Sequence, residues 1–152
     1  MNKYELIMSE SVTIGDAILY RVRALKDSKF FKAGDVGGYI EKLENLSMSG
    51  DAWVSGDAWV SGNARVFGNA RVSGDALVSG QKSIITILDI GSERGCLTIH
   101  SDSKIGVRVT RGCFTGTIDE FLSAVEKTHG DNIHGKIYHA AIEMAKVQFE
   151  ID

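Results

Sequence analysis

A six-residue unit of the form Val-x-Gly-Asp/Asn-Ala-x repeats through the middle of the chain, and it constrains the fold more than any other feature. Complete units begin at Val54, Val60, Val66 and Val72, and a fifth unit opens at Val78. A repeat of fixed period buries its apolar side chains only by stacking on its neighbours, so the chain must coil on itself. We therefore expect the valine and the alanine of each unit to point inward. The last residue of the unit, which stands between that alanine and the next valine, should point outward.

Flexible linkers have a similar composition, rich in glycine and small polar residues. Valines at regular spacing would have nothing to pack against in a linker, so we favour a folded repeat. Counting back by six residues extends the valine position to Met48 and Val36, and the alanine position to Leu46 and Ile40. The repeats then span residues 36–83, or about two and two-thirds coils if three units make one triangular turn.

The segments on either side of the repeats, residues 1–35 and 84–152, are expected to cap them within one folding unit. Open coil ends would expose unpaired backbone and apolar surface. The first segment is interpreted as a β-hairpin, because apolar and polar residues alternate along residues 17–25. The last segment contains strand-like stretches at residues 84–90, 95–100 and 104–110.

Two helices are expected at the end of the chain. Thr117 and Glu120 form a capping-box pattern at the start of the first helix. Asp131 or Asn132 caps the second helix. Apolar residues then recur at three- and four-residue spacing, and we expect this stripe to pack on the strands. Its members are Ile137, Ala141, Met144 and Val147.

Bulk composition limits the classes of function. The formal net charge of −3 argues against a general nucleic-acid binder, because such proteins concentrate basic residues on one face. The chain has two cysteines and a polar start, Met1 to Glu5, which is unlike a secretion signal. We therefore expect reduced thiols, a cytoplasmic location and no membrane-spanning segment.

The valine and alanine hexads resemble the hexapeptide repeat of left-handed β-helix proteins. In that family, the aliphatic residue that opens each unit points into a triangular prism and the small residue fills a corner. The chain as a whole resembles small bacteriophage and prophage proteins with Gly-Asp-Ala-x-Val repeats. In those proteins, a strand–helix module follows that is similar to residues 111–121 and 128–132 here. The resemblance implies a mainly β fold: a short left-handed parallel β-helix over residues 36–83, with an N-terminal hairpin and a C-terminal strand and two-helix cap.

The enzymes known on that scaffold are acyltransferases and γ-type carbonic anhydrases. The former need a histidine base, and the latter need three histidines around zinc. All four histidines of this chain follow the repeats: His100, His129, His134 and His139. We therefore expect no catalytic residue, metal or cofactor. An acyltransferase-like enzyme, or one working from Cys113 or a histidine, is the least favoured alternative.

Cys96, His100 and Cys113 are a further candidate for a metal site, since neighbouring strands could bring them together. Three ligands without a Cys-x-x-Cys pair are a weak zinc signal. Buried structural thiols are the preferred interpretation.

Residues eighteen positions apart should stack in successive coils. This spacing places Trp53 beside Arg71, Trp59 beside Leu77 and Ser49 beside Phe67, and it aligns Asn45, Asn63 and Gln81 in a ladder. So much outward apolar surface is typical of an interface. Left-handed β-helices commonly pack as trimers, so the resemblance implies a homotrimer with an interface of Trp59, Phe67 and Leu77.

Arginines beside aromatic rings suggest a site for a phosphate-bearing base, because the guanidinium binds phosphate and the ring stacks on the base. The candidate ligand-binding residues are Trp53, Trp59, Arg65, Arg71, Arg108 and Arg111. By analogy with phage proteins, we expect a non-catalytic binding protein that counteracts host defence by sequestering a nucleotide-type small molecule. The alternative is an inhibitor that binds a host defence protein complex through Trp53, Trp59 and Phe67.

Overall fold

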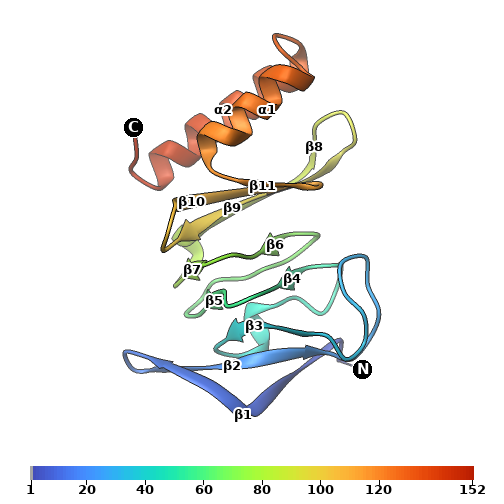
Figure 1. The fold of residues 1–152 in the computed structure, drawn as a ribbon, viewed down its shortest axis with the longest axis vertical. Coiled ribbons are helices and arrows are strands. Elements are labelled where there is room, and N and C mark those ends of the chain that lie inside the picture. The colour runs from blue at the N-terminus through green and yellow to red at the C-terminus, as the bar shows by residue number, and fades with distance from the viewer. Residues whose placement is uncertain (1) are drawn as a thin grey trace.

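The chain runs from a β-hairpin at one end of the molecule to a pair of helices at the other, with the hexad repeats between them (Figure 1). The structure is a computed structural model that describes residues 2–152. Strands β1 (Tyr4–Ile14) and β2 (Ala17–Ala24) form the hairpin, whose turn contains Gly15 at a φ of 58°. Neither helix in residues 2–152 has the length and apolar character needed to cross a membrane.

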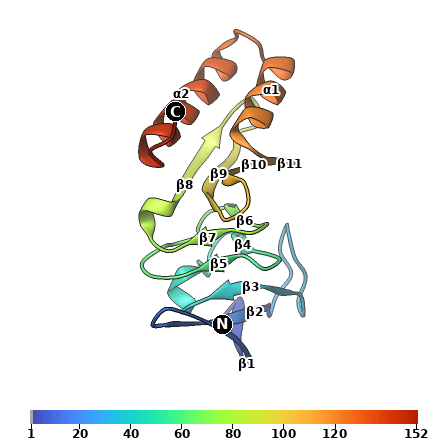
Figure 2. The same cartoon turned by 60° about the vertical axis from the view of Figure 1, so that its left-hand side comes forward.

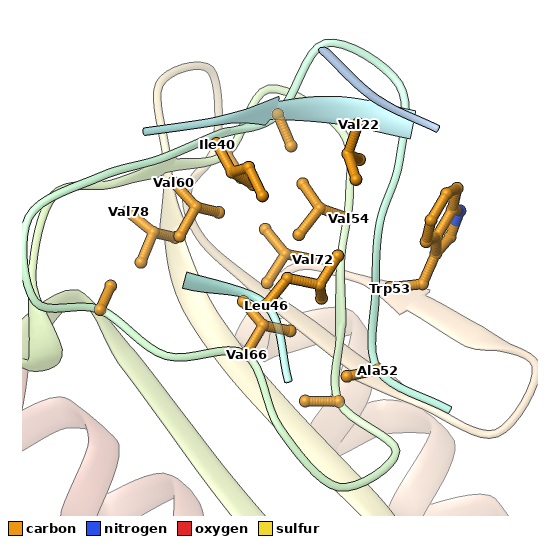
Figure 3. Packing of buried hydrophobic residues seen from close by; sticks show 14 of the residues in the cluster. Val22, Ile40, Leu46, Ala52, Trp53, Val54, Val60, Val66, Val72 and Val78 are labelled. Atoms are coloured by element: carbon orange, nitrogen blue, oxygen red, sulfur yellow. The ribbon is translucent and has the colours of Figure 1, made fainter. Parts of the chain in front are cut away.

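The hexads form short strands that pair in parallel. The strands are β3 (Val36–Ile40), β4 (Trp53–Val54), β5 (Trp59–Val60), β6 (Arg71–Val72) and β7 (Leu77–Val78). Trp53 is opposite Arg71 and Trp59 is opposite Leu77, which confirms the predicted eighteen-residue stacking. All five repeat valines are fully buried, and Figure 3 shows them converging between the strands.

The predicted fold class, a left-handed parallel β-helix, is wrong. The strands belong to a five-stranded mixed sheet of order β1-β2-β3-β5-β7, a two-stranded parallel sheet of β4 and β6, and a separate four-stranded antiparallel sheet. The reason is that β2 pairs antiparallel with β3, so the hairpin continues the sheet along one side of the repeats instead of only closing their end. The repeat strands β3, β5 and β7 therefore belong to a mixed sheet, and the repeats do not form a single parallel solenoid.

The register of the first repeats also differs from the prediction. Ile40 is opposite Val60 and Leu46 is opposite Val66, both twenty residues apart, so these two side chains occupy valine positions. Val36, predicted to point inward, is 51% exposed. Two extra residues between Leu46 and Val54 shift the register, because the buried positions there are eight residues apart instead of six.

Residues 84–116 form an antiparallel sheet of order β11-β10-β9-β8, preceded by the short 3-10 helix η2 (Gln81–Ser83). Its strands are β8 (Ile84–Ile90), β9 (Gly95–Asp102), β10 (Gly106–Arg111) and β11 (Phe114–Gly116). Helices α1 (Ile118–Thr128) and α2 (Ile133–Gln148) lie on one side of this sheet and the repeats lie on the other (Figures 1 and 2). The sheet therefore separates two clusters of buried apolar residues.

Helix caps follow the sequence closely, whereas the buried face of α2 does not. The Thr117 hydroxyl accepts from the Glu120 amide at 3.1 Å, and the Glu120 carboxylate accepts from the Thr117 amide at 2.9 Å. Asn132 caps α2 by accepting from the Gly135 amide at 3.0 Å. Of the predicted inward stripe only Ala141 is buried. Ile137, Met144 and Val147 are exposed, and the inward residues are Tyr138, Ala141, Ile142 and Ala145.

Candidate functional site

The central residues of the candidate site lie on either side of Val66, which opens the third complete repeat unit. Val66 points into the core and is fully buried, so its neighbours Arg65 and Phe67 both point outward. Phe67 is 40% exposed, a large apolar surface for a residue between glycines and polar side chains. A cation and an aromatic ring therefore lie on one face, two residues apart.

Two hollows of about 620 and 600 Å³ meet at Ser47, Arg65 and Gln81 and form one groove, here named the Arg65 groove. One arm extends along the short 3-10 helix η1 (Leu43–Asn45), and the other extends beneath the edge strand β8. The lining side chains are Lys42, Leu43, Glu44, Leu46, Ser47, Met48, Ser49, Asn63, Ala64, Arg65, Phe67, Gln81, Ile84 and Thr86.

The charge in the groove is not neutralised at Arg65. Within residues 2–152, no carboxylate lies within 4.0 Å of the Arg65 guanidinium or of the Lys42 ammonium group. Glu44 lines the same arm of the groove as Lys42. A guanidinium without a carboxylate partner keeps its donors for an anionic ligand.

Hydroxyl and amide groups supply further hydrogen-bonding capacity. The Thr86 hydroxyl is buried and has no hydrogen-bond partner in the described part of the chain. Ser47 and Ser49 hydroxyls lie 3.1 Å apart, so one can donate to the other. The Asn63 side-chain oxygen accepts a hydrogen bond from the backbone amide of Gln81 at 3.0 Å. The buried Thr86 oxygen is the clearest unmet hydrogen-bonding need beside the groove.

The predicted amide ladder has two different roles along its length. Asn45 is fully buried, and its side-chain amide donates to the Gly62 and Ala64 carbonyls at 3.2 and 2.9 Å. Asn63 and Gln81 are exposed and line the groove. Asn45 therefore stabilises the turn at η1, whereas Asn63 and Gln81 present polar groups to the groove.

Trp53 lies away from the groove, in the core. It is 7% exposed, its ring stacks on Phe31 with centroids 4.3 Å apart, and Tyr4 lies 6.0 Å away on another side. Phe31 belongs to the connection between β2 and β3, which folds over this side of the repeats. Trp53 therefore contributes to packing and does not line the groove.

Trp59 and Leu77 lie on the outer face of the five-stranded sheet. Tyr39, Trp59 and Leu77 are adjacent rungs of this sheet, and Arg21 covers the Tyr39 ring at 4.3 Å. None of these residues lines the Arg65 groove. The predicted trimer interface of Trp59, Phe67 and Leu77 is thus divided between two faces, and the homotrimer stays a prediction.

Arg71 and Arg111 come together in a separate basic cluster near the β10–β11 turn. The Arg71 guanidinium lies 4.6 Å from the Phe30 ring centroid and donates to the Gly112 carbonyl. Burial lowers the pKa of Arg71 from its ordinary value, and the charge of Arg111 lowers it further. Arg111 donates to the Tyr138 hydroxyl at 3.0 Å. Both guanidinium groups thus already make contacts that tie the repeats and α2 to the sheet.

Arg108 has a structural partner. Its Nε donates to the Asp102 carboxylate at 3.0 Å, and the side chain lies so close to Gly74 that an added Cβ there would be 2.5 Å from Nε. The Arg108 side chain is only 17% exposed. We therefore interpret it as a contact between the last repeat and the sheet.

The cysteines and His100 are dispersed. Burial raises the pKa of the Cys96 thiol, whereas Cys113 is exposed at the turn before β11. His100 is fully buried, and burial lowers its pKa. No three histidine, cysteine or acidic side chains in residues 2–152 are arranged to hold a metal ion.

The sequence did not predict several of the residues that line the groove. Ser47 follows η1, Gln81 belongs to η2 and Thr86 belongs to β8. The eighteen-residue stacking that placed Ser49 beside Phe67 and Asn63 beside Gln81 was the available signal. Thr86 could not be found in that way, because β8 lies outside the period.

Comparison with protein-family models, curated proteins and solved structures yields no match to this chain.

Proposed function

We propose that the Arg65 groove binds a nucleotide-type, phosphate-bearing small molecule and holds it without chemical change. The observation that carries the proposal is the pairing of Arg65, which has no carboxylate partner within 4.0 Å, with the exposed Phe67 ring on the same face. Guanidinium groups donate two parallel hydrogen bonds to a phosphate, and an aromatic ring stacks on a base.

The size and lining of the groove support this class of ligand. Each arm, at about 620 and 600 Å³, is within the range of small-molecule sites, which is about 300–1,000 Å³. Leu43, Met48 and Phe67 supply apolar surface, while Ser47 and Gln81 supply donors and acceptors near the middle. The phosphate would lie at Arg65 and the base would lie against Phe67.

Binding without turnover is favoured by the kinds of side chain present. No histidine or cysteine of residues 2–152 lines the groove, and its one acidic residue, Glu44, is at the η1 end. The remaining polar groups are donors and acceptors of the kind used for recognition. Sequestration of a signalling nucleotide would suit a protein that counteracts host defence, a role that rests on the resemblance to phage proteins.

Replacing Arg65 with glutamine should weaken ligand binding about 10- to 100-fold, because a charge-assisted pair of hydrogen bonds to phosphate is lost. Phe67→Ala should weaken it by a similar factor through loss of stacking. Isothermal titration calorimetry with nucleoside mono-, di- and triphosphates and cyclic dinucleotides would measure both effects. Native mass spectrometry after incubation with bacterial lysate would show whether the retained ligand is released intact.

Arg94→Gln is the matched control, since this arginine is 77% exposed and lies on the β8–β9 loop, away from the groove. It makes the same change in net charge and should leave affinity unchanged. Equal binding by wild type and Arg65→Gln would contradict the proposed site. Recovery of a chemically altered nucleotide would favour an enzyme, and stoichiometric capture of a host protein would favour the inhibitor.

A further inference from the structure

Helix α2 carries an apolar stripe that no other part of residues 2–152 covers. Ile133 and Val147 are 68% and 79% exposed, and Ile137 and Met144 are about half exposed. Together with the exposed Ala140, these residues form a row that we name the α2 stripe. Four large exposed apolar side chains on a helix of sixteen residues are typical of an interface.

The spacing of the stripe is that of a helix-pairing seam. Ile133, Ile137, Ala140, Met144 and Val147 are separated by four, three, four and three residues. This is the a/d pattern of a coiled coil over two heptads. The buried face of α2 is different, since it is formed by Tyr138, Ala141, Ile142 and Ala145. The helix therefore has two apolar faces, and only one of them is used within the chain.

The position of the stripe leaves room for another helix. Helix α1 lies along one flank of α2 (Figure 2), where His139 of α2 approaches Glu126 of α1 at 4.0 Å. On the other flank, Gln148 donates to the Lys82 carbonyl at 3.1 Å, and Met144 and Val147 line an open hollow beside η2. The stripe faces away from α1, and its centre is about 120° around the helix from His139.

Charges beside the stripe indicate what occupies it. Lys136 and Glu143 are seven residues apart, so they follow one another along the same edge of the stripe. When two such helices pack antiparallel, that edge of one helix meets the same edge of the other. With Ile137 facing the partner's Ala140, and Ile133 facing the partner's Met144, each Lys136 would lie beside the partner's Glu143.

We propose that the α2 stripe joins two copies of this chain, with their α2 helices packed antiparallel. Two symmetry-related Lys136–Glu143 pairs then border the seam, and a parallel arrangement would not place these opposite charges together in register. Ala140 lies near the twofold axis, where its small side chain lets the helices approach closely. This interface does not depend on the Arg65 groove.

Sedimentation velocity from micromolar to hundred-micromolar concentration tests the proposal on the full chain. The wild-type protein should reach twice the mass of one chain. Ala140→Glu should remain monomeric with an unchanged free energy of unfolding, because residue 140 is exposed in the single chain. Lys136→Glu and Glu143→Lys should each weaken the dimer about tenfold, and the double variant should recover the wild-type dissociation constant.

Lys127→Glu on the exposed face of α1 is the matched charge reversal and should leave the dimer unchanged. A wild-type protein that stays monomeric over the whole range would overturn the proposal. A mass of three chains that persists in Ala140→Glu would also overturn the proposal, because that result is expected from a trimer built on the repeats. Failure of the double variant to restore association would overturn the antiparallel arrangement.

Discussion

Replacing Trp53 with alanine should lower the free energy of unfolding by about 3–5 kcal/mol, the range for removing a large buried aromatic side chain. The Trp53 ring packs in one cluster with Phe31 and Tyr4, whose own ring centroids are 5.8 Å apart, and Figure 3 shows Trp53 pointing away from the repeat valines. Tyr4 is fully buried, and this burial, followed by the charge of Asp51, raises the pKa of Tyr4 to about 12. Urea denaturation followed by far-ultraviolet circular dichroism measures the loss.

Trp59→Ala is the matched control, because Trp59 has the same position in the next repeat unit. Its side chain is only half-buried on the outer face of the mixed sheet, so the loss should be less than half as large. Equal losses for the two variants would contradict the packing difference. Ligand affinity at the Arg65 groove should change in neither variant, since neither ring lines it.

Replacing Asp102 with asparagine should lower the free energy of unfolding by about 3–5 kcal/mol at pH 7, because it leaves a largely buried arginine without its counter-charge. The Asp102 carboxylate is fully buried and accepts from Arg108 Nε at 3.0 Å and from the backbone amides of Lys104 at 2.8 Å and Ile105 at 3.1 Å. It also accepts from the Asp75 amide of the last repeat at 3.2 Å. The residue therefore joins the repeats to the antiparallel sheet.

The effect of Asp102→Asn should depend on pH. Burial alone would raise the pKa of this carboxyl group, but the hydrogen bonds from Lys104, Arg108 and Ile105 outweigh burial and lower it. A lowered pKa in the folded state adds stability above the unfolded value of about 3.9, and that stability is lost as pH falls below it. The difference between wild type and variant should therefore narrow below about pH 4 in urea titrations.

Asp89→Asn is the control for this measurement. Its side chain is 69% exposed and lies 3.7 Å from Arg94, and its φ of 55° is one that asparagine tolerates well. A change within about 1 kcal/mol is expected, as for surface ion pairs in general. A constant difference between wild type and Asp102→Asn from pH 7 to pH 2 would contradict the role assigned to the ionised carboxylate.

The period of the repeats predicted their local structure well. Buried valines and alanines, parallel pairing at eighteen residues and the outward direction of Arg65 and Phe67 all follow from a six-residue pattern. The two helix starts at Thr117 and Asn132 also follow from local capping chemistry. These features depend on neighbouring residues or on a strict period, and both are visible in a sequence.

The outward residues that become covered in the folded protein could not be predicted from the repeat. Trp53 and Trp59 are equivalent in the repeat, yet only Trp53 is buried, because the connection carrying Phe31 folds over it. Likewise, the spacing of apolar residues in α2 matched the exposed stripe better than the buried face, since Tyr138 and the small alanines give a weaker periodic signal. Burial depends on which distant segment supplies the covering side chains.

The amino-acid sequence by itself determined that the repeats stack in successive turns, which of their side chains point inward, and where the two helices begin. Only the tertiary structure decided that β2 pairs antiparallel with β3, so that three repeat strands join a mixed sheet and no single parallel solenoid forms. It also decided that Ser47, Arg65 and Thr86 share one groove. The physical reason is that hydrogen bonding along a strand edge and packing between distant segments are long-range choices, which a local period does not specify.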